Sequence, residues 1–135
     1  MRSALVAVLL LSACASAPEA EPTHFLSGTK WLRMDDVDAN PHGATMDFIG
    51  SRASGYTGCN RWTADVTEQG EELRFGMVAT TEMACTSPMQ RDTERHFLRV
   101  LDQTRYAHFD QDSLVLMDSR QRQIAQFNSN LPTPE

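Results

Sequence analysis

The sequence predicts a mainly β, single-domain protein in which about eight short antiparallel strands curl around, or are plugged by, one helix. Its 135 residues suffice for one domain. Between residues 29 and 128, short strand-like segments, of which residues 62–66 alternate bulky and polar positions, are separated by turn-forming residues. One segment of this region, residues 88–104, carries apolar side chains at helical spacing instead. The sequence shows neither a second domain nor an internal repeat.

Composition and charge narrow the class of protein. Hydrophobic residues make up 41% of the chain and charged residues 22%, which is typical of globular proteins and not of disordered ones. The chain has 18 acidic residues against 12 basic ones, for a net charge of −6. Its basic residues are scattered singly, whereas a nucleic-acid surface needs them clustered. We therefore expect no nucleic-acid partner.

The expected strands end at turn or loop signals. Gly50-Ser51 and Gln69-Gly70 mark tight turns, and residues 38–43 form a loop dense in turn-forming residues. Gly76 separates two short strands. In chain order, the expected strands cover residues 31–37, 45–49, 52–57, 62–66, 73–75, 78–81, 105–109, 113–117 and 123–127.

The helix has the clearest local signals. Ser87 is suited to cap its start and Pro88 to occupy its first position, while Gln90 stands where a capping box needs it. Its apolar side chains form a single stripe, so we expect it to pack on the sheet and not to cross a membrane. That stripe consists of Met89, Phe97, Val100, Leu101 and Thr104.

The N-terminus is typical of an exported protein. Residues 4–11 are an unbroken apolar stretch that is too short to span a membrane as a helix. Leu11-Ser12-Ala13-Cys14 resembles a bacterial lipobox, in which the cysteine thiol takes a diacylglyceryl group and the chain is cut before it. This predicts a signal peptide over residues 1–13 and a lipid anchor on Cys14. The alternative is a plain secreted protein with a coincidental cysteine.

The lipobox also predicts where the protein resides. Residues 14–28 would be the lipidated cysteine and a flexible tether, and residues 129–135 a loose C-terminal tail. Ala15, not Asp, follows the cysteine, which under the sorting rule of enteric bacteria favours the outer over the inner membrane. We expect a bacterial cell-envelope protein, anchored in the membrane by lipid, with its domain in the periplasm.

Two cysteines remain once Cys14 is assigned to lipid. In an oxidising compartment, Cys59 and Cys85 most simply form one disulfide. The other readings are a reactive Cys59 thiol and two unpaired cysteines packed as small hydrophobic residues. A metal site fits poorly, because there is no Cys-x-x-Cys pair and the histidines, at positions 24, 42, 96 and 108, lack ligand spacing.

The middle of the chain resembles the META domain family, also described as HslJ-like. The resemblance spans residues 29–128, with Trp31-Leu32 near its start and Leu114-x-Leu116 near its end. Its motifs are Ser54-Gly55-x-x-Gly58-Cys59-Asn60-Arg61-Trp62, Leu73-x-Phe75-Gly76-x-Val78-Ala79-Thr80-Thr81-Glu82-Met83-Ala84-Cys85 and Glu94-x-x-Phe97-x-x-x-Leu101.

The resemblance implies an antiparallel, partly open β-barrel of lipocalin-like topology, with the helix at its opening. It also implies an envelope-associated protein linked to heat shock or stress tolerance, without an established enzymatic activity. The sequence departs from the family in one place, because the last hairpin turn, Asp118 to Arg122, lacks the expected glycine.

Few residues suggest chemistry. Thr80-Thr81-Glu82 pairs hydroxyls with a carboxylate and His96 is a candidate base, but the sequence supplies no partners that would complete a catalytic site. Residues 35–40 have acidic spacing like that of a calcium loop, yet lack its central glycine and distal glutamate. We therefore expect no catalytic residue, no metal and no cofactor.

Five aromatic residues are either core or contacts for a hydrophobic ligand: Trp31, Phe48, Trp62, Phe75 and Phe97. The leading hypothesis is a non-enzymatic, lipid-anchored envelope protein that binds or stabilises an envelope protein or lipid, and is monomeric. The alternative is a carrier or pilot-type chaperone that holds a lipid tail or apolar peptide inside the barrel. An enzyme is the third hypothesis, which would require polar groups brought together by the fold.

Overall fold

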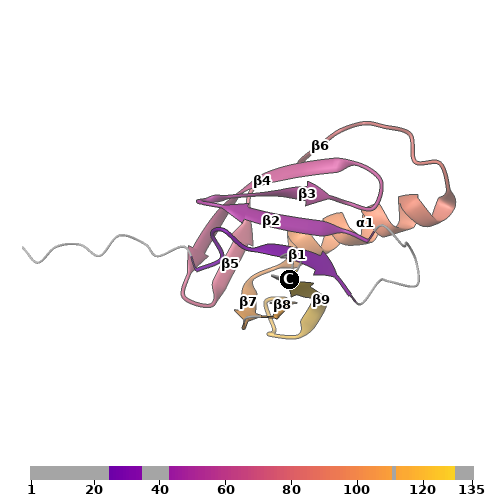
Figure 1. Ribbon diagram of the computed structural model, residues 1–135. Coiled ribbons are helices and arrows are strands. Elements are labelled where there is room, and N and C mark those ends of the chain that lie inside the picture. The colour runs from indigo at the N-terminus through magenta and orange to yellow at the C-terminus, as the bar shows by residue number, and fades with distance from the viewer. Residues whose placement is uncertain (1–24, 35–42, 111, 130–135) are drawn as a thin grey trace, which may run out of the picture.

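The computed structural model describes residues 25–34, 43–110 and 112–129, which form nine strands and one helix (Figure 1). The mainly β architecture with a single helix confirms the predicted fold class. In chain order the elements are β1 (Lys30–Arg33), β2 (Thr45–Ile49), β3 (Arg52–Tyr56), β4 (Arg61–Gln69), β5 (Glu72–Phe75), β6 (Ala79–Thr80), α1 (Pro88–Gln103), β7 (Tyr106–Phe109), β8 (Ser113–Met117) and β9 (Gln123–Ser129).

Eight of the strands form a closed antiparallel barrel. The hydrogen-bonded order runs β1, β2, β3, β4, β5, β7, β8 and β9, and β9 pairs again with β1. β6 is a short addition that pairs with β4. The shortest strand pairing in the barrel joins β5 to β7 through one residue pair, Glu72↔Tyr106. The opening expected in the barrel wall is therefore closed by this short pairing.

Most elements lie where the sequence places them, and the exceptions have physical causes. β2 and β8 have the predicted bounds, whereas β4 continues past Val66 because its buried–exposed alternation persists. β6 is shorter than predicted, and both of its residues are exposed, so no burial supports a longer strand. β1 ends at Arg33, and the rest of the predicted first strand lies largely outside the described residues.

The helix plugs the barrel with one face. Thr93, Phe97, Val100 and Leu101 are its buried residues, and Phe97 is fully enclosed. The ring of Phe97 lies 5.4 Å from that of Trp62 and 6.4 Å from that of Phe127 on β9, both in edge-on contacts. Helix and barrel therefore share one hydrophobic core.

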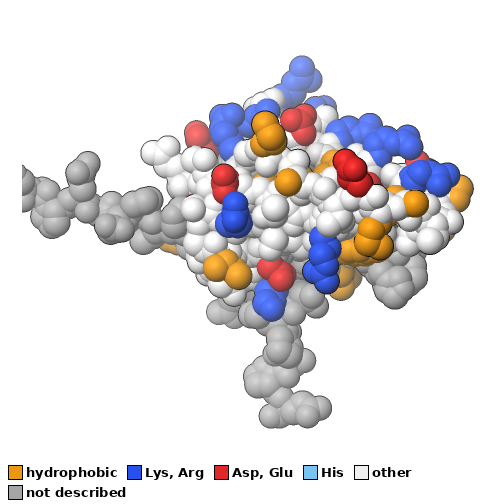
Figure 2. Space-filling model, turned by 90° about the horizontal axis from the view of Figure 1, so that it is seen from above, with side chains coloured by type: hydrophobic (Ala, Val, Ile, Leu, Met, Phe, Trp, Pro, Cys, Tyr) orange, Lys and Arg blue, Asp and Glu red, His pale blue; other side chains and the backbone are white. Residues whose placement is uncertain are grey.

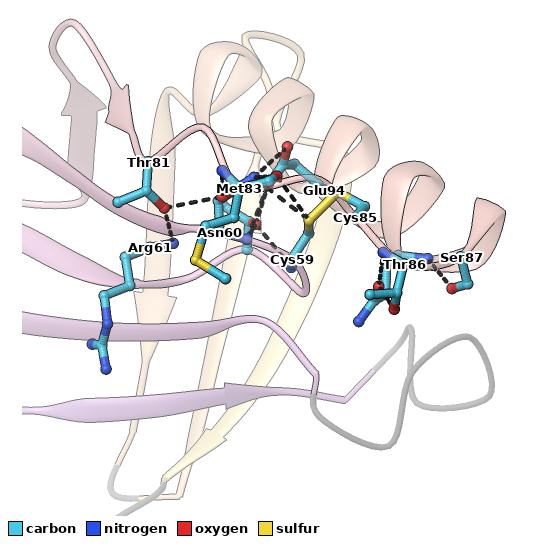
Figure 3. The surroundings of a disulfide bond; sticks show 11 residues. Cys59, Asn60, Arg61, Thr81, Met83, Cys85, Thr86, Ser87 and Glu94 are labelled. Carbon is cyan, nitrogen blue, oxygen red and sulfur yellow. Dashed lines mark hydrogen bonds between the residues drawn. A yellow bond between two sulfur atoms is a disulfide. The ribbon is translucent and has the colours of Figure 1, made fainter.

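The start of α1 has a modified capping arrangement. The Ser87 side chain accepts a hydrogen bond from the backbone N–H of Gln90, as predicted. The side chain of Gln90 reaches past Ser87, however, and its Oε1 accepts from both the N–H and the hydroxyl of Thr86, each at 2.7 Å. Thr86 supplies two donors to that oxygen, so the reciprocal half of the capping box moves back by one residue (Figure 3).

The last hairpin turn forms without glycine. Gln121 takes the left-handed conformation there, with φ of 58°. Asp118 holds the turn, because its Oδ1 accepts from the backbone N–H groups of Arg120 and Arg122. Its Oδ2 accepts two hydrogen bonds from the Arg122 guanidinium, at 2.9 and 2.7 Å. These hydrogen bonds, led by those from the Arg122 side chain, lower the pKa of Asp118 from its ordinary value.

Acidic and basic side chains are interspersed over the face that carries β3, β4 and β6 (Figure 2). The sequence is acidic overall, yet this face shows no single-sign field. Among the described residues, no helix is long and apolar enough to cross a bilayer.

Candidate functional site

The densest group of polar contacts surrounds the disulfide between Cys59 and Cys85, whose Cα atoms are 5.5 Å apart (Figure 3). The bond joins the turn before β4 to the segment that leads into α1. It forms between the two cysteines that the sequence predicts to pair. A reactive Cys59 thiol is therefore absent from this structure.

Asn60 is the centre of this group and is 4% exposed. Its side-chain oxygen accepts from the Met83 N–H at 2.8 Å and from the Thr81 hydroxyl at 3.0 Å. Its side-chain amide donates to the Met83 carbonyl and to the Glu94 carboxylate. One asparagine therefore ties together β4, the loop that follows β6, and α1 (Figure 3).

Glu94 completes the group from the helix. Its Oε2 accepts from the Thr57 hydroxyl at 2.6 Å and from the Asn60 N–H at 3.1 Å. The Thr57 hydroxyl oxygen in turn accepts from the N–H groups of Cys59 and Asn60. Gly58 permits this tight turn, because its φ of 103° is one that side chains disfavour. We name Thr57, Cys59, Asn60, Cys85 and Glu94 the latch.

The polar groups of the latch make contacts within the fold. Its carboxylate, hydroxyl and amide groups bind backbone groups and one another, so none is poised toward an incoming reactant. Ligand atoms of Cys59, Cys85 and Glu94 lie within 4.8 Å of one another. The two sulfurs are bonded to each other, however, and a metal would need them as free thiolates.

The other described residues considered for chemistry lie at different places in the structure and do not meet in one site. The Thr81 hydroxyl donates to Asn60 and accepts from the Arg61 N–H, so it belongs to the edge of the latch. Thr80 and Glu82 are exposed. His96 is exposed on α1, on another part of the surface. The calcium-like segment, residues 35–40, lies outside the described residues.

Of the five aromatic side chains proposed as ligand contacts, four belong to the buried core and Phe75 packs against it as a partly buried residue. Phe48 and Phe75 are 6.3 Å apart, and Phe75 and Trp62 are 6.0 Å apart, between ring centroids. The Trp62 N–H donates to the Thr45 carbonyl, and that of Trp31 to the Thr29 hydroxyl. A ligand that reached these rings would have to displace packed neighbours.

The described surface is hollowed elsewhere, between α1 and the β8–β9 hairpin. Two adjoining hollows of about 800 and about 630 Å³ share Gln103 and Ile124. We name them together the α1–β9 groove. None of the five aromatic residues lines it. No motif in the sequence indicates this groove, although helical spacing does place Arg95 and Arg99 on one side of α1.

The model of the META domain family matches residues 25–130. The chain belongs to the META domain family. A comparison with curated proteins finds no match. The predicted resemblance, made from the motifs around Cys59 and Cys85, is therefore confirmed, and the META domain coincides with the barrel and its helix.

Solved structures share the fold of this META domain. An NMR structure of a protein from Burkholderia xenovorans is similar with a TM-score of 0.67 and 23% identity, over 90% of this chain and 97% of that one. A crystal structure of a DUF4847 family protein from Bacteroides vulgatus is similar with a TM-score of 0.59 and 13% identity, over 81% of this chain and 97% of that one. At these identities the likeness concerns the fold alone.

Proposed function

We propose that this META domain protein is a non-enzymatic, lipid-anchored component of the bacterial cell envelope, which binds or stabilises other envelope components and contributes to stress tolerance. The observation that carries the proposal is Leu11-Ser12-Ala13-Cys14, a lipobox at the end of a short apolar stretch. Two or three acyl chains on Cys14 would hold the protein firmly at the membrane.

The folded domain supports export. Disulfides persist in oxidising compartments such as the periplasm and are rare in the cytosol. Cys59 and Cys85 are bonded within the latch, where the surrounding hydrogen bonds hold both chain segments in place. A cytosolic location would leave this crosslink open to reduction.

The contacts of the latch support a binding role over catalysis. A catalytic carboxylate must face its substrate, whereas Glu94 faces Thr57 and Asn60. The filled arrangement of the five aromatic side chains likewise favours binding on the outside of the barrel over a carrier role inside it.

Fractionation of cells that make the full chain tests the proposal. We expect the wild-type protein in the membrane fraction, labelled by radioactive palmitate, and the Cys14→Ser variant unlabelled and outside that fraction. Ser16→Ala, a neutral change in the tether, is the matched control and should behave as wild type. Membrane association of Cys14→Ser equal to that of wild type would overturn the lipid anchor.

A further inference from the structure

The α1–β9 groove concentrates positive charge on an acidic protein. Five arginines line it against two aspartates, although the whole chain carries a net charge of −6. The arginines are Arg95 and Arg99 on α1, Arg105 after it, and Arg120 and Arg122 in the last hairpin turn. The fold thus assembles a basic surface from residues that are scattered in the sequence.

Two of these arginines are available to a ligand. Arg95 pairs with Asp92, Arg122 pairs with Asp118, and Arg105 donates to carbonyl groups at the end of α1. Within the described part of the chain, the guanidinium groups of Arg99 and Arg120 have no such partner. Guanidinium groups bind carboxylates in a planar, two-bond geometry, so these two side chains suit an acidic ligand.

The walls between the arginines are partly apolar. Met89, Val100 and Ile124 line the groove, and Met89 is half exposed although it belongs to the predicted apolar stripe of the helix. Thr93, which is 2% exposed, lies beneath this wall.

The dimensions of the groove favour an extended peptide. Its first hollow follows α1 from Met89 to Gln103, about 21 Å at 1.5 Å per residue, and its second continues past Gln103 to Arg120. A peptide in the extended conformation covers the length of the first hollow with about six or seven residues. An acyl chain would need an enclosed cavity, whereas this groove is open to solvent.

We propose that the α1–β9 groove binds an extended acidic peptide segment of a partner protein, in which carboxylates alternate with apolar side chains. Carboxylates pair with Arg99 and Arg120, and apolar side chains contact Met89, Val100 and Ile124. The proposal deepens the binding role given above and rests on it.

Fluorescence anisotropy with a defined peptide tests this proposal. The probe is a fluorescein-labelled peptide of about twelve residues, longer than the first hollow so that it also extends along the second, in which Glu alternates with Leu or Ala. We expect binding that weakens as salt rises, and no binding of the sister peptide with Gln for each Glu. The variant Arg99→Glu/Arg120→Glu should bind at least about tenfold more weakly.

A charge-matched control isolates the groove from overall charge. Arg61→Glu/Arg74→Glu changes two exposed arginines on β4 and β5, outside both hollows, and should bind the peptide as wild type does. Both double variants should keep the wild-type melting temperature. Equal binding by the two double variants would overturn the groove as the site. Binding to phosphatidylglycerol vesicles but not to the acidic peptide would overturn the peptide as the occupant.

The two proposals fail separately. If the wild-type chain fractionates with the membrane but does not bind the peptide, the groove inference alone is overturned. If it binds the peptide but is neither labelled by palmitate nor membrane-associated, the lipid anchor alone is overturned.

Discussion

The carboxylate of Glu94 lies 2.6 Å from the hydroxyl of Thr57, a residue 37 positions earlier in the chain. This contact joins α1 to the turn that precedes β4, next to the disulfide. The carboxylate also accepts from the backbone N–H of Asn60, which it shares with the hydroxyl oxygen of Thr57. The helix is thus attached to the barrel by polar contacts as well as by Phe97.

Removal of the Glu94 carboxylate should destabilise the domain. Hydrogen bonds to charged groups contribute about 1.5–3 kcal/mol, so we expect Glu94→Ala to lower the free energy of unfolding by about 2 kcal/mol. Glu94→Gln keeps one acceptor oxygen and should cost less. Urea denaturation measures both. Asp92→Ala, an exposed change on the same helix, is the control; a Glu94→Ala variant as stable as this control would contradict the role of the latch.

Gly55 on β3 has no room for a side chain. A Cβ at this position would collide with the backbone carbonyl of Thr45 on β2. Backbone atoms of a strand cannot move away as a flexible side chain can. We therefore expect Gly55→Ala to lower the melting temperature markedly or to prevent folding. At Gly76, a Cβ would lie 3.4 Å from the Asp65 carbonyl oxygen, an ordinary contact. Gly76→Ala should therefore melt close to wild type, and equal losses in the two variants would refute the steric argument.

Replacement of Gln121 by glycine should stabilise the protein. A residue other than glycine in the left-handed conformation costs about 1 kcal/mol, and Gln121 has φ of 58°. We expect Gln121→Gly to raise the free energy of unfolding by up to about 1 kcal/mol. The neighbouring change Ser119→Gly lacks this benefit, since Ser119 has no positive φ, and should lower stability. Thermal denaturation of both variants shows whether each change raises or lowers the melting temperature.

The same turn should make stability depend on pH. The Arg122 side chain and backbone N–H groups lower the pKa of Asp118 in the folded protein. A carboxyl with a lowered folded pKa stabilises the fold above its unfolded pKa of about 3.9, and this contribution is lost as pH falls through the folded value. We expect Asp118→Asn to melt lower than wild type at pH 7, with the difference shrinking below about pH 4.

A control separates this effect from the loss of any acidic group. Asp112→Asn removes an exposed carboxylate whose side chain makes no hydrogen bond within the described residues. Its melting temperature should follow that of wild type across the same pH range. A difference between Asp118→Asn and wild type that stays constant from pH 7 to pH 3 would contradict the pKa argument.

Local patterns in the sequence predicted local structure well. Alternation and turn residues gave the bounds of β2 and β8, and the capping residue and apolar stripe gave α1 to within one residue. The pattern failed at the side chain of Gln90, where Thr86 offers two donors that no spacing rule favours. No pattern indicated the burial of Arg33, because its charge alone would favour the surface.

The candidate sites could be predicted only in part. The pairing of Cys59 with Cys85 could be predicted, because they are the two cysteines left once Cys14 is assigned to the lipobox. The contact of Asn60 with Glu94 spans 34 residues and leaves no periodic signal in the sequence. The groove likewise depends on the last hairpin returning beside α1, which only tertiary structure determines.

Because β1 pairs with β9, the barrel is closed between its first and last strands. The chain could therefore begin at another turn without changing the order of the strands around the barrel. Trp31 lies opposite Ser129, so the first and last strands of the barrel are neighbours in one ladder. A short linker could join these strands, and new ends could open at the exposed Gln69-Gly70 turn. Such a circular permutant would begin at β5 instead of β1 while it retains the core, the latch and the groove.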